Sequence, residues 1–149
     1  MPEAERYSEK ELESRIIQNL QDFILELGKG FGFIGSQYRI TLNNTHFYVD
    51  LVFFHRILRC FVIIDLKIGE VKHTDVGQMN MYLNYFKEEE SIQGDNPPIG
   101  IILAAGKDEI MIKYATGGLS NKVFVSKYQT HLPDKDLLQE RVRNILDAK

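Results

Sequence analysis

Two apolar segments with the length of β-strands each contain charged residues, and this limits the folds open to the chain. The segment YVDLVFF (48–54) places Asp50 among apolar side chains, and FVIIDLKI (61–68) places Asp65 and Lys67 near its end. Burying an ionised side chain is costly unless a partner or a metal ion compensates its charge. The fold therefore has to provide partners for these three side chains.

Strand geometry predicts how the three charges meet. Asp65 and Lys67 are two residues apart, so their side chains leave the same face of a strand. If the turn is centred on Ile57 and Leu58, residues whose numbers add up to 115 pair, which places Asp50 opposite Asp65; a register offset by one or two residues is the alternative. Adjacent carboxylates repel by roughly 0.2–1 kcal/mol even on an exposed sheet. A divalent cation reverses that sign, because Mg²⁺ binds one or two carboxylates, water and substrate phosphates. Lys67, beside this predicted metal site, could hold a water or neutralise charge on a phosphate.

The rest of the chain predicts helices around a sheet. Within residues 8–28 apolar side chains recur every three or four positions, and Ser8 with Glu11 forms a predicted capping box at the start of this helix. Strands are predicted at 36–42, 46–54, 60–68, 99–105, 109–115 and 122–128, and further helices at 74–90 and 134–148. Helices before and after a mixed sheet predict a layered α/β fold, with a single domain over residues 1–149.

Three further side chains are candidates for the site. Glu13 falls on the inward-facing side of the first helix and is a candidate third acid. Gln78 and Tyr82 are four residues apart and share one face of the second helix, from which they could reach a phosphate or orient Lys67. Simpler interpretations stay open: Glu13 suits the favourable end of a helix dipole, and Tyr82 suits packing. Asp65 and Lys67 also fit a plain ion pair at a strand end.

A glycine pattern, Gly30-x-Gly32-x-x-Gly35, matches the fingerprint of dinucleotide-binding loops. That fingerprint works between a strand and the start of a helix, where backbone N–H groups approach a pyrophosphate. Here the order is reversed, since a predicted helix precedes the glycines and a predicted strand follows them. The glycines therefore predict a helix stop and a bend into the first strand.

Composition excludes several classes of protein. The single cysteine, Cys60, excludes an internal disulfide and a Cys-rich zinc site. The start of the chain is acidic and polar, unlike a secretory signal, and no apolar run approaches a membrane span. We therefore expect a cytoplasmic location and no membrane contact. The net charge of −3 gives no global attraction for nucleic acid, so any DNA contact requires a local basic patch or bound cations.

These residues together resemble a known family. Asp50, Asp65-x-Lys67 and Gln78-x-x-x-Tyr82, after a helix with Glu13, look like the motif of the PD-(D/E)XK nuclease superfamily. The phrases FYVDLVFFHR, GQMNMYL and DNPPIGIIL are similar to the C-terminal nuclease domain of YhcG-type proteins, and the resemblance covers nearly the whole chain. It implies a restriction-endonuclease-like, three-layer core with a mixed sheet of about five strands. It also implies Mg²⁺-dependent, or Mn²⁺-dependent, hydrolysis of DNA phosphodiester bonds.

The sequence departs from the family motif at two positions. Asp65 replaces the glutamate that the superfamily often carries, and Val49 replaces the proline of the named motif. YhcG-type proteins are longer and carry a separate N-terminal region. The implied roles are metal binding by Asp50 and Asp65, catalysis by Lys67, support by Gln78, a catalytic helix acid at Glu13, and substrate binding by Tyr82.

Other functions fit the same residues. A non-catalytic nucleic-acid-binding or assembly module that retains the nuclease fold is favoured by the net negative charge. RNA is an alternative substrate, because no segment has a pattern that reads base edges. A homodimer is compatible with an exposed strand edge and a terminal helix.

Overall fold

The computed structural model describes residues 2–106 and 109–147, with side chains from residue 10 onward. Its centre is a mixed sheet of five strands in the order β1-β2-β3-β4-β5, in which β3 and β4 are parallel and the other neighbours antiparallel. The strands are β1 (Phe31–Leu42), β2 (Thr45–His55), β3 (Cys60–Ile68), β4 (Ile99–Ala105) and β5 (Ile110–Ala115). The longer helices are α1 (Pro2–Leu27), α2 (His73–Tyr85) and α4 (Lys135–Asp147).

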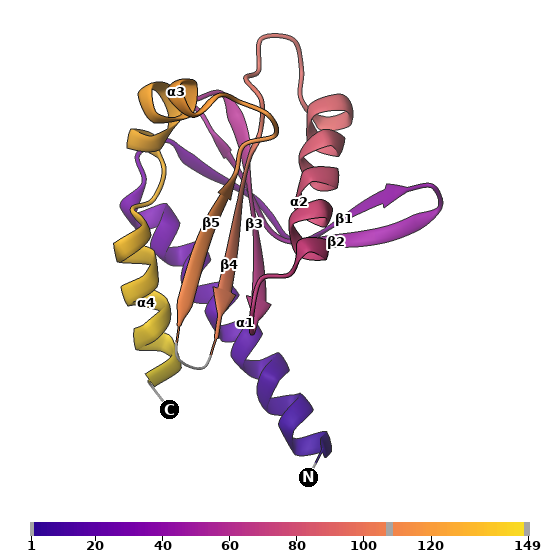
Figure 1. Ribbon diagram of the computed structural model, residues 1–149, viewed down its shortest axis with the longest axis vertical. Helices are drawn as coiled ribbons and strands as arrows, with labels where there is room; N and C mark the ends of the chain where they lie inside the picture. Colours follow the sequence, from indigo (N-terminus) through magenta and orange to yellow (C-terminus); the bar gives the residue numbers. More distant parts are fainter. Residues whose placement is uncertain (1, 107–108, 148–149) are drawn as a thin grey trace.

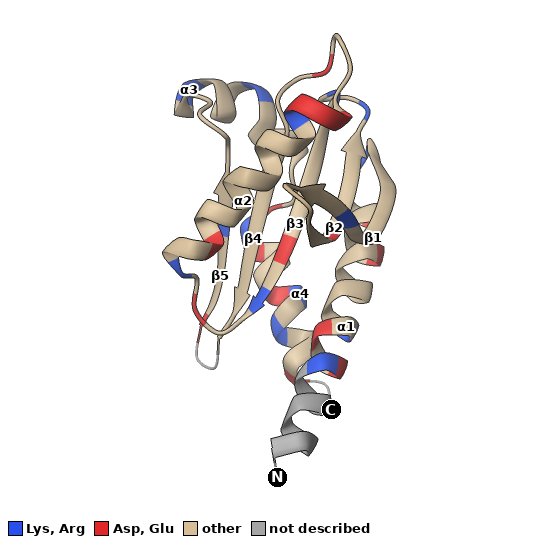
Figure 2. Ribbon diagram, turned by 90° about the vertical axis from the view of Figure 1, so that its right-hand side faces the viewer, with Lys and Arg blue, Asp and Glu red and all other residues tan. Residues whose placement is uncertain are grey.

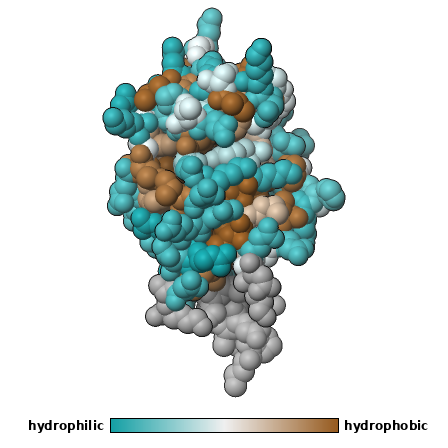
Figure 3. Space-filling view, turned by 60° about the vertical axis from the view of Figure 1, so that its left-hand side comes forward, coloured by the Kyte–Doolittle hydropathy of each residue, from teal (hydrophilic) through white to brown (hydrophobic). Residues whose placement is uncertain are grey.

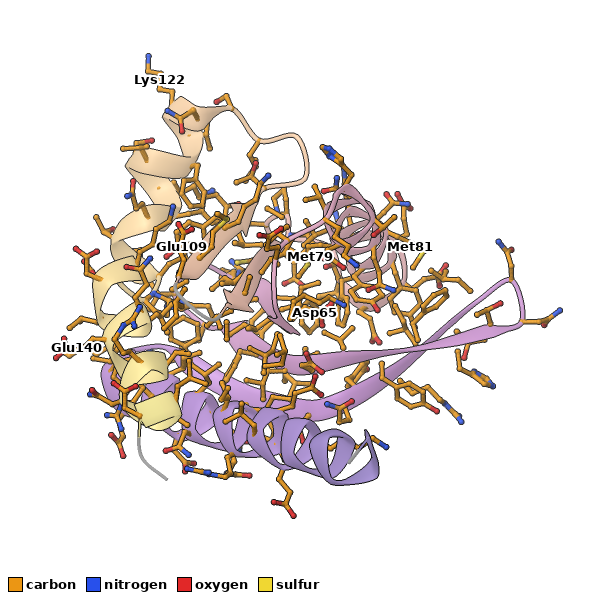
Figure 4. All side chains as sticks on the ribbon, turned by 60° about the horizontal axis from the view of Figure 1, so that its bottom comes forward. Asp65, Met79, Met81, Glu109, Lys122 and Glu140 are labelled. Atoms are coloured by element: carbon orange, nitrogen blue, oxygen red, sulfur yellow. The ribbon has the colours of Figure 1, made fainter. Side chains whose placement is uncertain are left out.

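Helices cover both faces of the sheet, which gives three layers (Figures 1 and 4). On one face, which we call the α1–α4 face, buried side chains such as Leu20, Phe53 and Val142 form an apolar cluster. On the other, the α2 face, Ile63 and Met79 belong to a second cluster. This arrangement confirms the predicted layered α/β fold with a mixed sheet. None of the helices in the described part of the chain has the length and apolarity of a transmembrane span.

Helix α1 starts earlier than the sequence predicts. It begins at Pro2, so Ser8 lies inside the helix and the predicted N-cap is wrong. Proline is favoured in the first turn of a helix because its missing N–H has no intrahelical partner there. The predicted end is confirmed: α1 stops at Leu27, the Gly28 N–H donates to the Ile24 carbonyl at 2.9 Å, and Gly30 adopts φ +103° in the bend before β1.

The predicted strand at 122–128 is wrong, because this segment is helical. It forms α3 (Asn121–Val123) and a π-helical turn (Phe124–Tyr128), and the Ser120 hydroxyl caps it by accepting from the Val123 N–H at 3.2 Å. Phe124 and Tyr128, four residues apart, are buried, whereas Val123 remains 40% exposed. Burial thus follows a helical period. Figure 3 shows separate apolar patches on the side of the molecule that carries α3 and α4.

Candidate active site

Asp50 and Asp65 lie side by side where β2 and β3 separate. The regular ladder between these strands ends at the pair Leu51 and Ile64, so the register is the predicted one. Beyond it, the Leu66 N–H donates to Asp50 Oδ2 at 2.8 Å, and the Asp50 N–H donates to Asp65 Oδ1 at 3.3 Å. Each carboxylate thus takes the place of a backbone carbonyl as acceptor. The predicted proximity of the two acids is confirmed.

Asp65 is an almost completely buried carboxylate. Only 5% of the residue is exposed, and it lies on β3 beside α2 (Figure 4). Burial, followed by the neighbouring carboxylate of Asp50, raises the pKa of Asp65 to about 6. The Asp50 N–H and the Lys67 ammonium act in the opposite direction, but more weakly. The protein alone therefore leaves negative charge at this point only partly compensated.

Gln37 is a neighbour of Asp50 that the sequence analysis missed. Its Nε2 donates to Asp50 Oδ1 at 2.9 Å, and its backbone adopts the left-handed conformation with φ +47°. Ser36 pairs with Leu51 and Tyr38 with Val49, so Gln37 and Asp50 face each other across the ladder. The sequence did contain a signal for this contact. A turn at residues 43–44 pairs residues of β1 and β2 whose numbers add up to 87, as those of Gln37 and Asp50 do.

Lys67 is tied to the start of α2. Its Nζ lies 3.6 Å from Asp75 Oδ1, with a third of the Lys67 side chain exposed. The other oxygen of Asp75 accepts from the Lys72 N–H at 2.9 Å, so Asp75 caps the helix from its third position. Its contact with Lys67 connects the candidate lysine to α2.

Tyr82 and Gln78 come from the face of α2 that covers the sheet. Tyr82 is buried with its ring 6.2 Å from that of Phe47. Burial raises the pKa of Tyr82, and the charges of Asp65 and Asp50 raise it further, so the phenol near the carboxylates stays neutral. Gln78 is half-buried, one turn before Tyr82. The structure thus brings Tyr82 to the acids and Gln78 to the same side of α2.

Glu13 is half-buried on α1. Within residues 10–106 and 109–147, whose side chains are described, no group of three or more His, Cys, Asp or Glu residues is arranged to hold a metal ion. Glu13 therefore does not complete a preformed set of three acids with Asp50 and Asp65. Its role as the helix acid stays a prediction.

The two aspartates fit a hard divalent cation. Carboxylate oxygens are the protein ligands that Mg²⁺ prefers, and one or two of them are enough when water and phosphate complete the shell. The Gln37 amide and the Leu66 N–H hold the Asp50 carboxylate, and the Asp50 N–H holds that of Asp65. Bonds that orient ligands in this way are typical of metal sites. The charge that raises the Asp65 pKa is also the charge a cation would compensate.

Comparisons with known proteins identify the family of the chain. The family model of the YhcG PDDEXK nuclease domain matches residues 1–143. The curated protein "Putative nuclease YhcG" of Escherichia coli (strain K12) is 49% identical over 140 residues, which are 93% of this chain and 37% of that protein. The chain therefore spans little more than a third of the length of this curated relative.

Solved structures with similarity to the chain are more distant. A repair endonuclease from Pyrococcus abyssi is 21% identical with a TM-score of 0.42, and the match covers 61% of this chain and 38% of that one. A protein described as SSO0001 is 12% identical with a TM-score of 0.40, and the match covers 89% of this chain and 57% of that one.

Proposed function

Since this chain belongs to the family of YhcG PDDEXK nuclease domains, we propose that it hydrolyses phosphodiester bonds in DNA with the help of Mg²⁺ or Mn²⁺. One observation carries the proposal: Asp50 and Asp65 lie together where β2 and β3 separate, and Lys67 follows Asp65 by two residues on β3. We also propose a cytoplasmic location.

Asp50 and Asp65 would hold the metal ion. When bound, the ion would stabilise negative charge on the phosphate and lower the pKa of a coordinated water. Gln37 acts as a positioning residue, because its amide fixes one oxygen of Asp50. The Asp50 N–H donates to Asp65 and the Leu66 N–H donates to Asp50, which orients both carboxylates. Ligands held in this way are already positioned for a metal ion.

Lys67 supplies the positive charge. Its ammonium leaves the same face of β3 as Asp65, and it donates to a phosphate oxygen or holds the attacking water. In the structure the same ammonium faces Asp75 at 3.6 Å, a distance that leaves room for it to turn toward a substrate. Asp75 is thus a counter-charge that keeps Lys67 near the site.

The helix residues complete the assignment. Tyr82 keeps its phenolic proton beside the two acids, so it can donate a hydrogen bond to a phosphate oxygen. Gln78 carries an amide on the same face of α2 and supports the orientation of substrate or of Lys67. Glu13 would approach the metal from α1 as a third acid.

The proposal is tested by substitution at the two kinds of catalytic group. Asp50→Ala and Lys67→Ala should each lower Mg²⁺-dependent cleavage of plasmid and oligonucleotide DNA by a factor of at least about 1,000, as expected for groups that act on the transition state. Glu140→Ala on α4 is the control with a similar loss of charge, and circular dichroism checks folding. Undiminished cleavage by Asp50→Ala contradicts the site, and cleavage of RNA alone contradicts the substrate.

A non-catalytic binding or assembly module is the second candidate. It is favoured by the ion pair between Lys67 and Asp75, which occupies the candidate catalytic lysine. Titration calorimetry with Mg²⁺ or Mn²⁺ separates the two functions. A nuclease should bind the ion in wild type and lose that binding in Asp50→Ala, whereas a module of this kind need show no heat that depends on Asp50.

A further inference from the structure

Residues 38–49 form an arm that projects from the sheet past α2 (Figure 1). The pairing of β2 with β3 ends at Leu51, so beyond Asp50 the strands β1 and β2 pair only with each other among the described strands. A two-stranded ribbon alone is marginally stable in water. The arm therefore needs support from the rest of the protein.

One face of the arm receives that support from α2. Ile40 and Val49 are buried in the cluster of the α2 face, and Phe47 packs on the ring of Tyr82. The Tyr38 hydroxyl donates to Glu90 Oε2 at 2.6 Å and connects the base of the arm to the end of the π-helical turn (Phe86–Glu90) that follows α2. These contacts hold the arm in a fixed position beside the candidate active site.

The opposite face of the arm is exposed and begins at Asp50. Strand side chains two residues apart share a face, so Gln37, Arg39 and Thr41 form one row on β1. His46, Tyr48 and Asp50 form the matching row on β2. Hydrogen bonds mark both ends, from Gln37 Nε2 to Asp50 Oδ1 at 2.9 Å and between Thr41 Oγ1 and His46 Nδ1 at 2.8 Å, and Arg39 pairs with Tyr48 between them.

The two-stranded ribbon of β1 and β2 twists at the level of Asp50. Leu51 and Phe53 pack on the α1–α4 face, whereas Val49 and Phe47, on the same side of the strand, pack on the α2 face. The left-handed backbone of Gln37 lies at this twist. Because of the twist, the apolar side of the arm lies on α2, and the opposite side stays open to solvent, where Tyr48 is 53% exposed.

The exposed face is poor in negative charge. From residue 27 to residue 64 the only acidic residue is Asp50, although the chain contains 21 Asp and Glu. Arg39 lies in the exposed rows of the arm, whereas Lys29, Arg56 and Arg59 lie near the opposite ends of β1 and β2. In Figure 2 acidic positions lie on the helices, on the loops between elements and on β3. The exposed rows of the arm therefore carry no acid beyond Asp50 at their base, which favours the approach of a polyanion along them.

We propose that this exposed face binds duplex DNA beside the scissile phosphate, an inference that rests on the proposed nuclease function. A two-stranded ribbon fits the major groove of B-DNA, and Arg39 supplies a phosphate contact. The turn residues Asn43 and Asn44 carry amides that hydrogen-bond to base edges. A single strand would instead require a series of aromatic side chains for successive bases, and the exposed rows contain only Tyr48.

The length of the arm sets the size of the contact. Six residues separate Asp50 from Asn44 at the turn, which corresponds to about 20 Å at the rise of a strand. Since one base pair occupies about 3.4 Å along the duplex, the arm reaches about six base pairs from the scissile phosphate. Duplexes that extend less than this on the arm side should bind more weakly than longer ones.

Binding without hydrolysis tests the arm separately from catalysis. Fluorescence anisotropy with a labelled duplex of random sequence in EDTA, over a range of salt concentrations, measures affinity and its salt slope. Arg39→Gln should weaken duplex binding by about tenfold and reduce the salt slope by about one, as expected for one lost phosphate contact. Arg143→Gln on α4, the matched control on the α1–α4 face, should bind like wild type. Thermal unfolding confirms that both variants are folded.

Equal duplex affinity of Arg39→Gln and Arg143→Gln overturns the proposal, as does tighter binding of single strands than of duplexes by wild type. The outcomes are distinguishable from a failure of the nuclease function. If wild type cleaves DNA but Arg39→Gln binds normally, the arm proposal alone is wrong. If wild type binds duplexes through Arg39 but cleaves no nucleic acid, the arm proposal stands and the hydrolytic function is wrong.

Discussion

The two faces of the sheet contribute differently to the stability of the fold and to the candidate active site. On the α1–α4 face the buried cluster is apolar and continuous from α1 to α4. On the α2 face the apolar cluster borders Asp65, which with His55 makes up the buried polar or charged residues in the described part of the chain. The first face stabilises the fold by removing apolar surface from water. The second gives up part of that stabilisation to keep a carboxylate pair in place.

This contrast resembles the general relation between stability and function. Residues that are arranged for binding or catalysis often lower the stability of the free protein, and the rest of the fold compensates. If this holds here, substitutions on the α1–α4 face should change stability and leave the site intact. Substitutions at the acids should abolish function and increase stability.

The largest stability effect is expected on the α1–α4 face. Leu20 on α1 is 1% exposed, and Leu20→Ala should lower the free energy of unfolding by about 2–5 kcal/mol through lost burial and a residual cavity. Urea unfolding followed by circular dichroism measures this change. The kcat of the folded fraction for DNA cleavage should equal that of wild type. A kcat that falls although the protein is folded would contradict the separation of the two faces.

A smaller effect of opposite sign is expected at Asp65. Its pKa is raised to about 6 from an ordinary 3.8, so its favourable contribution to folding is complete below about pH 4 and is lost as the pH rises through about 6. Asp65→Asn removes the ionised form and should raise the free energy of unfolding at pH 7.5 in EDTA by up to about 3 kcal/mol. The asparagine oxygen can still accept from the Asp50 N–H.

The pH dependence provides the control for this substitution. At pH 4 the wild-type carboxyl is protonated in the folded state, so wild type and Asp65→Asn should unfold at similar urea concentrations. Addition of Mg²⁺ at pH 7.5 should stabilise wild type and leave Asp65→Asn unchanged, because ligands stabilise the state that binds them. A variant less stable than wild type at pH 7.5 in EDTA would show that the ionised carboxylate helps folding.

The sequence predicted the centre of the site because strand pairing follows simple rules. The turn around Ile57 and Leu58 and the apolar pattern on both sides determine one register, and that register brings Asp50 to Asp65. The helical spacing of Gln78 and Tyr82 similarly predicted a shared face on α2. These features depend on local geometry, which a sequence encodes directly.

Features that depend on tertiary contacts were not predictable in the same way. The pairing of Lys67 with Asp75 requires the relative position of β3 and α2. The segment 122–128 has the β-branched composition of a strand, but Phe124 and Tyr128 find buried positions one helical turn apart. Tertiary packing overrides local propensity in such a segment.

Gln37 provides the smallest and most selective test of the contrast between the two faces. Its amide holds Asp50 at 2.9 Å, although φ +47° is a conformation that asparagine tolerates better than glutamine. Gln37→Asn should therefore relax the backbone, but its side chain is one methylene too short to hold Asp50. We expect unchanged or slightly higher stability and a kcat lowered about fivefold, equivalent to about 1 kcal/mol for one hydrogen bond.

Gln37→Ala should lose the same activity without the gain in backbone preference. Because Asn and Ala differ in backbone preference but both lack the bond, equal loss of kcat assigns the effect to the positioning of Asp50. Full activity in either variant would show that the neighbouring backbone N–H groups hold Asp50 without help from Gln37.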